Sequence, residues 1–314
     1  MIIESQAPCR ISLVGGGTDI EPYVSLYGGA VISFAINIRQ KFTLFIGNDI
    51  YGVKNSVPDG CNLEFVYAFR DEFGVNSFHH SRFISESDGG LNSGIGSSAA
   101  VAVAIVGALA KSQNKTMTRT EIAEKAWQIE TQKLGMFGGK QDQYAAAFGG
   151  ANLFEFGNEV KVNPIDISKI LSSIVLLHTN TIRSSPVIQE EFKNLTDFKK
   201  DALDELKSLI NPTLATIEQG DIKTLGEILN ETYALKKKSN YRTTNERIGN
   251  IYHYAKINKA YGGKICGAGD GGFMMFVVEP DRKKDFIHKM ELYGLTNWNF
   301  DIDKNGLEVK KLTP

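Results

Sequence analysis

Residues 93–100 read Ser-Gly-Ile-Gly-Ser-Ser-Ala-Ala and run directly into the apolar stretch 101–110. This order predicts a glycine-serine loop that opens onto the first turn of a helix. The glycines let the backbone come close to an anion, and the first turn offers N–H groups that have no partner within the helix. Ser97 and Ser98 add two hydroxyl groups. The stretch therefore predicts a phosphate-binding site.

The spacing of the loop narrows the kind of phosphate site. A Walker A loop requires a lysine after its last glycine, and none follows Gly96, so the P-loop NTPases are excluded. Gly94, Gly96 and Ala99 match the dinucleotide-binding pattern of a Rossmann oxidoreductase, but that loop leaves a hydrophobic strand, and residues 85–92 are polar. A flexible, serine-capped loop before a buried helix is the alternative that needs no ligand.

Length and composition favour a protein that acts on small molecules. The 314 residues predict two domains, because single cores stop growing near ~250 to 300 residues. The 35 Lys and Arg nearly balance the 36 Asp and Glu, which speaks against nucleic acid or an anionic membrane as a partner. The three cysteines, Cys9, Cys61 and Cys266, are too few and too scattered for a disulfide framework or a zinc site. Such cysteine usage fits the reducing cytosol. We expect a soluble, cytoplasmic protein, since there is no secretion signal and no apolar run long enough to span a bilayer.

Strands and helices alternate along the whole chain. In the first half we expect strands at 11–14, 30–36 and 41–46, and a helix at 119–134 that starts with the capping box of Thr118 and Glu121 and stops at Gly135. In the second half we expect strands at 173–178, 273–279 and 297–303, charged helices within 186–238, and a helix at 282–292. The composition changes near residue 165, so the predicted domains are 1–165 and 166–314.

A second glycine-rich loop, Gly-Ala-Gly-Asp-Gly-Gly, occupies residues 267–272. It also fits the dinucleotide pattern, but here the strand follows the glycines, which is the reverse of the Rossmann order. A tight turn would need only one or two glycines. Four among six residues indicate that something packs directly on this backbone, with a plain turn as the alternative.

Two carboxylates and one arginine are the candidates for chemistry. Glu130 lies on an apolar helical stripe, where it either reaches solvent or, if ATP is the ligand, joins Ser98 in a site of hard oxygens for Mg²⁺. Asp142 precedes an alanine-rich helix, so it is either an N-cap or an anion that orients an acceptor hydroxyl. Arg10 is its candidate partner. Such a pair suits phosphoryl transfer, which requires positioning and charge neutralisation.

Three motifs together resemble those of the GHMP kinases, the family of galactokinase, homoserine kinase, mevalonate kinase and phosphomevalonate kinase. They are Ala-Pro-Cys-Arg-Ile-Ser-Leu-Val-Gly-Gly-Gly-Thr-Asp at 7–19, the loop at 94–100, and Lys-Ile-Cys-Gly-Ala-Gly-Asp-Gly-Gly-Phe at 264–273. They occur in the family's order and span nearly the whole chain. Asp270 departs from the family pattern, which usually has a glycine there.

The resemblance implies a mixed α/β (α+β) fold, with an N-terminal domain like domain 2 of ribosomal protein S5 and a ferredoxin-like C-terminal domain. ATP and substrate would meet between the two. Asp142, with Arg10 beside it, would be catalytic and face the acceptor hydroxyl, and Ser98 and Glu130 would hold Mg²⁺. The residues implied to bind the ATP phosphates are Ser93, Gly94, Ile95, Gly96, Ser97 and Ser98.

The first motif bears on the substrate. Galactokinases carry Gly-Glu-His-Thr-Asp where residues 15–19 read Gly-Gly-Gly-Thr-Asp, so the histidine expected to contact galactose is Gly17. The sequence resembles the D-glycero-D-manno-heptose 7-phosphate kinases, which implies phosphorylation of the C1 hydroxyl for nucleotide-activated heptose and a surface glycan such as lipopolysaccharide or capsule. The implied substrate-binding residues are Arg10, Gly16, Gly17, Thr18, Asp19, Asp142, Gly267, Ala268, Gly269 and Arg183.

Other functions stay open at this point. A fucokinase-like or other sugar 1-kinase fits the same motifs, and 236–238 could either hold a sugar phosphate or be a solvated charged face. A non-catalytic sugar sensor on this fold would be expected to have lost one of Arg10, Ser98, Glu130 or Asp142, and all four are present. The chain could be a monomer or a homodimer.

Overall fold

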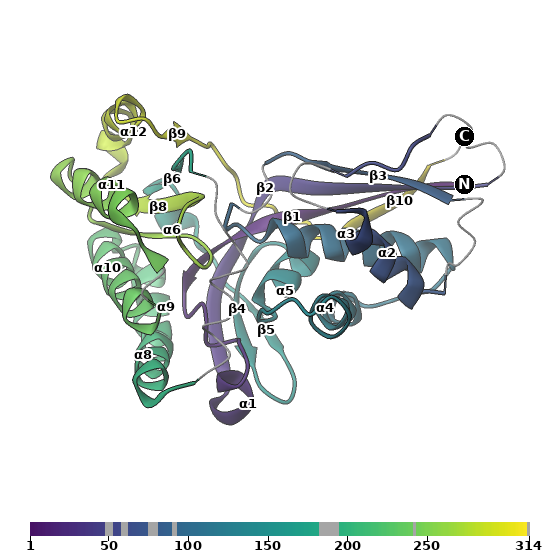
Figure 1. Cartoon of the computed structure of the whole chain (residues 1–314). Helices are drawn as coiled ribbons and strands as arrows, with labels where there is room; N and C mark the ends of the chain where they lie inside the picture. Colours follow the sequence, from purple (N-terminus) through teal and green to yellow (C-terminus); the bar gives the residue numbers. More distant parts are fainter. Residues whose placement is uncertain are drawn as a thin grey trace.

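The chain folds around two antiparallel sheets, each covered by helices (Figure 1). The computed structural model describes residues 1–47, 53–57, 62–74, 81–89, 93–181, 195–240 and 243–312. The first sheet has the order β10-β1-β2-β4-β5, with β3 also paired to β2. Its strands are β1 (Ile2–Val14), β2 (Gly29–Ile46), β3 (Ser81–Ser87), β4 (Ala151–Phe156), β5 (Lys161–Pro164) and β10 (Glu308–Leu312).

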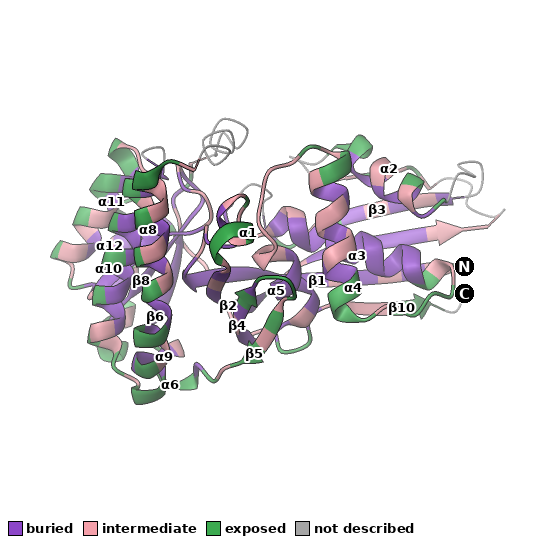
Figure 2. Cartoon of the chain, turned by 90° about the horizontal axis from the view of Figure 1, so that it is seen from below, coloured by how far each residue is buried: buried purple, intermediate pink, exposed green. Residues whose placement is uncertain are grey.

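Helices cover the first sheet because their apolar residues must be buried. They are α2 (Leu63–Glu72), α3 (Ser97–Ser112), α4 (Arg119–Gln128), η2 (Ile129–Lys133) and α5 (Gln141–Phe148), and a short α1 (Tyr23–Tyr27) follows β1. Helix α3 is apolar on all sides and almost entirely buried (Figure 2), as expected of a central helix. It packs on β1 and β2, so its N-terminus lies beside the first motif.

The second sheet has the order β7-β8-β6-β9. Its strands are β6 (Ile174–His178), β7 (Gly262–Ile265), β8 (Phe273–Val277) and β9 (Thr296–Asn297). The accompanying helices are α6 (Ser168–Leu171), α8 (Asp197–Ser208), α9 (Ile210–Gln219), α10 (Ile222–Ser239), α11 (Glu246–Ile257), η5 (Pro280–Arg282) and α12 (Lys283–Leu292). These helices carry exposed residues on their outer sides (Figure 2), and α8, α9 and α10 lie within the range 186–238 where charged helices are expected.

Most predicted elements are confirmed. The expected helix at 119–134 is α4 continued by η2, and the capping box of Thr118 and Glu121 is present. The predicted break between strands 30–36 and 41–46 is wrong, because β2 runs through both. Arg39 and Gln40 interrupt the apolar pattern, but Arg39 is paired with carboxylates of the C-terminal segment and Gln40 is buried. The end of β3 was not predicted, because residues 85–87 are polar although they pair antiparallel with β2.

The predicted strand at 297–303 is also wrong. Only Asn297 belongs to a strand, β9, and the chain then crosses back to the first sheet, where β10 pairs with β1. Trp298, Phe300 and Ile302 alternate with polar residues because they pack against the core during this crossing, and alternation of that kind imitates a strand. The predicted division near residue 165 falls between β5 and α6, while the last strand returns to the first sheet.

No helix in the described ranges is both long and apolar enough to cross a membrane.

Candidate active site

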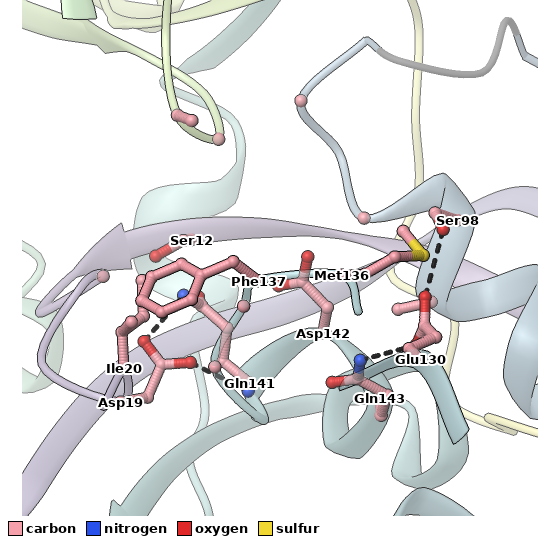
Figure 3. A pocket seen from close by; sticks show the side chains of 18 of the residues that line it. Ser12, Asp19, Ile20, Ser98, Glu130, Met136, Phe137, Gln141, Asp142 and Gln143 are labelled. Atoms are coloured by element: carbon pink, nitrogen blue, oxygen red, sulfur yellow. Dashed lines mark hydrogen bonds between the residues drawn. The ribbon is translucent and has the colours of Figure 1, made fainter. Parts of the chain in front are cut away.

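A cleft of about 690 Å³ lies where the two halves of the chain meet. One wall comes from β1, the 93–98 loop, α3 and the segment 136–143, and the other comes from α8, α10 and the second glycine-rich loop. Figure 3 shows the side chains of this cleft, with Asp19, Asp142 and Glu130 spread along its floor. The cleft therefore collects all three predicted motifs into one space.

The glycine-serine loop ends where α3 begins, at Ser97. Gly94 and Gly96 have φ of +83° and +73°, which side chains disfavour. A Cβ on Gly96 would lie 3.3 Å from Asp142 Oδ2 and 3.3 Å from Arg10 Cγ. The loop is thus pressed against the pair expected to do chemistry, with the N–H groups of α3 next to it, where an anion is favoured.

The second glycine-rich loop packs directly on the first. A Cβ on Gly267 would lie 2.6 Å from the Cα of Gly94, and Phe273 N donates to the carbonyl of Ser93 at 3.0 Å. The prediction that something packs on this backbone is confirmed, since the phosphate loop itself does. Asp270 takes φ +64°, and its carboxylate accepts from Asn245 at 2.9 Å, away from the cleft lining.

Arg10 and Asp142 form a two-pronged ion pair at the centre of the cleft. Arg10 Nε donates to Asp142 Oδ1 and Nη2 donates to Oδ2, both at 2.7 Å. A third donor, Arg10 Nη1, reaches the carbonyl of Gly94 at 2.9 Å. The side chain of Arg10 is buried, whereas that of Asp142 is 27% exposed. The predicted pairing is confirmed, but Asp142 is not a helix cap, because Lys140 is the N-cap of α5 and Asp142 lies in its first turn.

Glu130 is a buried carboxylate that accepts hydrogen bonds from two neutral side chains. Ser98 Oγ donates to Glu130 Oε1 at 3.1 Å, and Gln143 Nε2 donates to Oε2 at 2.7 Å. Burial raises the pKa of Glu130 to about 7, although both hydrogen bonds favour the charged form. In the described part of the chain no lysine or arginine pairs with Glu130. The alternative in which Glu130 reaches solvent is wrong, and the donor set of one carboxylate and one hydroxyl fits Mg²⁺, which takes few protein ligands.

Asp19 is fixed at the other end of the floor. Its carboxylate accepts from Gly17 N at 3.2 Å and from Gln141 N and Gln141 Nε2 at 3.1 Å each. Burial raises the pKa of Asp19, and the N–H groups of Gln141 and Gly17 oppose that rise. Gly139 packs so closely that a Cβ there would lie 2.0 Å from Asp19 Oδ2. The first motif and the segment before α5 are therefore locked together.

The structure brings most of the predicted residues to the cleft. The lining includes Arg10, Gly16, Gly17, Asp19, Gly94, Gly96, Ser97, Ser98, Glu130, Asp142, Gly267 and Ala268.

Four predicted residues do not line the cleft. Thr18 is buried, and its hydroxyl donates to the carbonyls of Gly15 and Ala30. Ile95 is a core side chain, Ser93 holds the second loop through its carbonyl, and Gly269 packs on the backbone of Thr243. In each case a residue of the motif supports the loop without lining the cleft.

The positive residues near the cleft are of two kinds. Lys236 lines it and donates to the carbonyl of Gly267. Lys237 and Lys238 are exposed, as a solvated face would be, and Lys238 pairs with Glu205. Arg183 lies outside the described residues.

Sequence reasoning did not single out Ser12, Gln141 and Gln143, which all line the cleft. A signal was available for Ser12, because it lies two residues after Arg10 on one strand and so shares its face. Gln141 and Gln143 flank Asp142 in the first turn of α5. Their contacts to Asp19 and Glu130 depend on tertiary packing that no local pattern contains.

The chain is similar to known kinases over its whole length. Residues 62–150 match the GHMP kinases N terminal domain, and residues 213–294 match the GHMP kinases C terminal domain. D-glycero-alpha-D-manno-heptose 7-phosphate kinase of Campylobacter jejuni is 33% identical, over 98% of this chain and 98% of its own. Mevalonate kinase of Pyrococcus horikoshii is 24% identical over 71% of this chain and 67% of its own.

A solved structure supports the same family. The D-glycero-D-manno-heptose 1-phosphate kinase from Bacteroides thetaiotaomicron has a TM-score of 0.79 and 26% identity, covering 99% of this chain and all of that one. The expected fold class is thereby confirmed. The matched domains, the shared length and the shared fold together assign this chain to the GHMP kinase family, as a sugar kinase that transfers phosphate from ATP to an alcohol group.

Proposed function

We propose that the protein phosphorylates the anomeric C1 hydroxyl of D-glycero-D-manno-heptose 7-phosphate with ATP and so forms the 1,7-bisphosphate. The observation that carries the proposal is the ion pair of Arg10 and Asp142, which faces the cleft directly beside Gly96 of the phosphate loop. The identity to the Campylobacter jejuni heptose 7-phosphate kinase over nearly the whole chain supports this acceptor. The product would feed nucleotide-activated heptose and a surface glycan.

ATP would lie along the part of the cleft that contains α3. Its phosphates would bind to the loop at 94–98 and to the first N–H groups of α3, where the helix dipole favours negative charge. The adenine would lie against the apolar lining of Phe65, Val101 and Met136. This direction would bring the terminal phosphate next to Gly96, which packs against Asp142.

Asp142 would accept a hydrogen bond from the acceptor hydroxyl and orient its oxygen toward the terminal phosphorus. Arg10 holds the carboxylate through two hydrogen bonds, so the orientation is set before the substrate binds. As the oxygen–phosphorus bond forms, the hydroxyl proton passes to Asp142 and ADP leaves with the bonding electrons. A loose transition state needs little more than such positioning and charge neutralisation.

Ser98 and Glu130 would hold Mg²⁺, whose charge neutralises the ATP phosphates when it is bound. The fit rests on a buried carboxylate whose hydrogen-bond partners among the described residues are a serine and a glutamine. Gln143 fixes one oxygen of Glu130 and leaves the other to face Ser98. We assign the 7-phosphate of the sugar to Lys236, whose ammonium group lines the cleft beside Gly267.

An ADP-release assay across heptose 7-phosphate, fucose, galactose and mevalonate tests the proposal. We expect the highest kcat/KM with heptose 7-phosphate. Lys236→Met should raise the KM for the phosphorylated sugar and leave the KM for ATP unchanged, because a lysine binds phosphate as a point charge. A preference for an unphosphorylated sugar would overturn the heptose assignment and favour a fucokinase-like 1-kinase. Binding without turnover would favour a sugar sensor.

A further inference from the structure

We infer that Ser12 and Gln141 form a subsite that reads neighbouring hydroxyl groups of the acceptor and selects a polyol over acceptors that carry a carboxylate. The inference rests on the proposed function, because it assumes that the acceptor lies between Asp19 and Asp142. Both residues line the cleft, and in Figure 3 Gln141 lies between the two carboxylates while Ser12 lies on the strand behind them.

Ser12 is a buried polar side chain that faces the cleft. It is 6% exposed, and within the described parts of the chain its Oγ has no hydrogen-bond partner. A hydroxyl buried without a partner is unfavourable, because it has given up its hydrogen bonds to water and made none in return. Because Ser12 follows Arg10 by two residues on β1, its side chain points to the same side as the guanidinium that holds Asp142. A ligand group next to Asp142 therefore meets Ser12 as well.

The side-chain amide of Gln141 has a fixed direction. Its Nε2 donates to Asp19 Oδ1 at 3.1 Å, and a carboxylate that also accepts N–H groups from Gly17 and from the backbone of Gln141 requires a donor there. The amide oxygen Oε1 consequently faces away from Asp19. It is buried and, among the described residues, no group donates to it. This oxygen can accept a hydrogen bond from a ligand that carries a donor, such as a hydroxyl group.

The two side chains converge on one point beside Gly16. A Cβ on Gly16 would lie 3.0 Å from Ser12 Oγ and 3.6 Å and 3.9 Å from the Nε2 and Oε1 of Gln141. Glycine at this position keeps a side chain away from both polar groups, since any Cβ there would crowd the Ser12 hydroxyl. The absence of a side chain, the serine hydroxyl and the amide oxygen thus define one small polar subsite.

The chemistry of the subsite favours hydroxyl groups. Gln141 Oε1 only accepts, Ser12 Oγ donates or accepts, and the nearby Asp19 carboxylate accepts. Two neighbouring hydroxyls of a sugar can satisfy all three. A carboxylate at this point, as in a hydroxy acid acceptor, would place oxygen against oxygen and negative charge beside Asp19, which low-polarity surroundings make more unfavourable. The subsite therefore admits a sugar and disfavours mevalonate.

Kinetics with deoxy sugars test the inference. Wild-type protein, Ser12→Ala and Gln141→Leu are compared on heptose 7-phosphate, fucose and galactose, on deoxy analogues that each lack one hydroxyl, and on mevalonate. We expect each variant to lower the kcat/KM for the best sugar about tenfold with the KM for ATP unchanged. Wild type should have a kcat/KM about tenfold lower for one or two of the deoxy analogues than for the complete sugar. The variant that lacks the side chain facing the missing hydroxyl should use the analogue and the complete sugar equally well, because it has no group left to bind that hydroxyl.

Ser5→Ala is the matched control. Ser5 is also a buried serine of β1 whose Oγ lacks a partner among the described residues, but it does not line the cleft. It should leave all sugar kinetics unchanged. Equal discrimination of deoxy analogues by wild type and variants would overturn the inference even if heptose 7-phosphate is phosphorylated, as would a preference for mevalonate. Variant-sensitive discrimination on another sugar would support the inference while refuting the heptose assignment.

Discussion

Asp142 is the residue on which the proposed chemistry depends most. Its ion pair with Arg10 sets its direction and its partial exposure leaves room for a hydroxyl. Asparagine has the same shape but cannot take the proton. We expect Asp142→Asn to lower kcat by ~10² or more while ATP binding changes little. Steady-state kinetics and an ATP titration measure both, with the exposed Asp285→Asn as the control. Wild-type turnover in the variant would remove Asp142 from the mechanism.

Glu130 should make stability depend on pH. Burial raises its pKa from the ordinary 4.5 to about 7, so the folded protein keeps a proton that the unfolded chain releases in this window. The free energy of unfolding therefore falls as the pH rises from 4.5 through 7, and this contribution is fully present only below 4.5.

Glu130→Gln removes that contribution. Urea unfolding without Mg²⁺ gives the free energy of unfolding of both proteins at acidic and at mildly alkaline pH. Between these two pH values wild type should lose roughly 3 kcal/mol more of this free energy than the variant does. Saturating Mg²⁺ and ATP should reduce the loss in wild type alone, because a cation stabilises the charged carboxylate. A difference that stays flat with pH would contradict the buried state of Glu130.

At the scale of elements, the contact between the two glycine-rich loops is the feature to test. Gly267 has φ +63°, and a Cβ there would meet the backbone of Gly94. Gly267→Ala should push the loops apart and raise the KM for ATP about tenfold or more, since a displacement near 1 Å at a reacting site is costly. ATP titration checks this.

The control for Gly267 is Gly249→Ala in α11, where a Cβ meets nothing within 4 Å. It should leave ATP binding unchanged and stabilise the helix slightly. If Gly267→Ala binds ATP as wild type does, the second loop does not support the first, and its glycines would only shape the turn before β8.

Elements were predictable where the signal was local. The capping box of Thr118 and the apolar run after Ser98 give α4 and α3 from a few residues each. The strand β2 was divided because Arg39 and Gln40 look like a loop until their tertiary partners are known. Trp298 and its alternating neighbours look like a strand although they cross between two sheets. A local sequence pattern indicates which side chains are buried, but it does not indicate which distant segment packs on them.

At the scale of the whole molecule, Arg39 ties the C-terminal segment to the first sheet. Its guanidinium donates to Asp303 at 2.6 Å and 2.9 Å and to Glu308 at 2.8 Å, across more than 260 residues. Arg39 and Asp303 are both largely buried. Arg39→Met should therefore destabilise the protein by about 3–5 kcal/mol, because it leaves the buried carboxylate of Asp303 without its cationic partner.

Lys41→Met on the same strand is the matched control for Arg39. Lys41 pairs with Glu4 and Glu86, but its side chain is 38% exposed, and exposed pairs contribute at most about 1 kcal/mol. Urea unfolding curves of both variants measure the contrast. Equal effects would mean that β10 and the crossing segment hold to the first sheet without Arg39.

The three motifs allowed the family and the pairing of Arg10 with Asp142 to be predicted from the sequence, because each motif is a compact loop with its own constraints. The sequence did not reveal that Gly267 rests on Gly94, that Gln143 holds Glu130, or that Gln141 holds Asp19. These contacts join segments far apart in the chain. For Thr18 the motif suggested too much. Its place in the motif implied contact with the substrate, but its hydroxyl donates to the carbonyls of Gly15 and Ala30 and so stabilises the turn.

The position of the new phosphate on the product shows directly whether the C1 hydroxyl is the acceptor. Heptose 7-phosphate is incubated with the protein, ATP and Mg²⁺, and the product is followed by ³¹P NMR. We expect a second signal from an anomeric phosphate, split by its coupling to the proton on C1, while the signal of the 7-phosphate persists. With Asp142→Asn the same signal and ADP should appear ~10² or more times more slowly. A new phosphate at another carbon, or no sugar bisphosphate while a different acceptor turns over, would contradict phosphorylation of heptose 7-phosphate at C1.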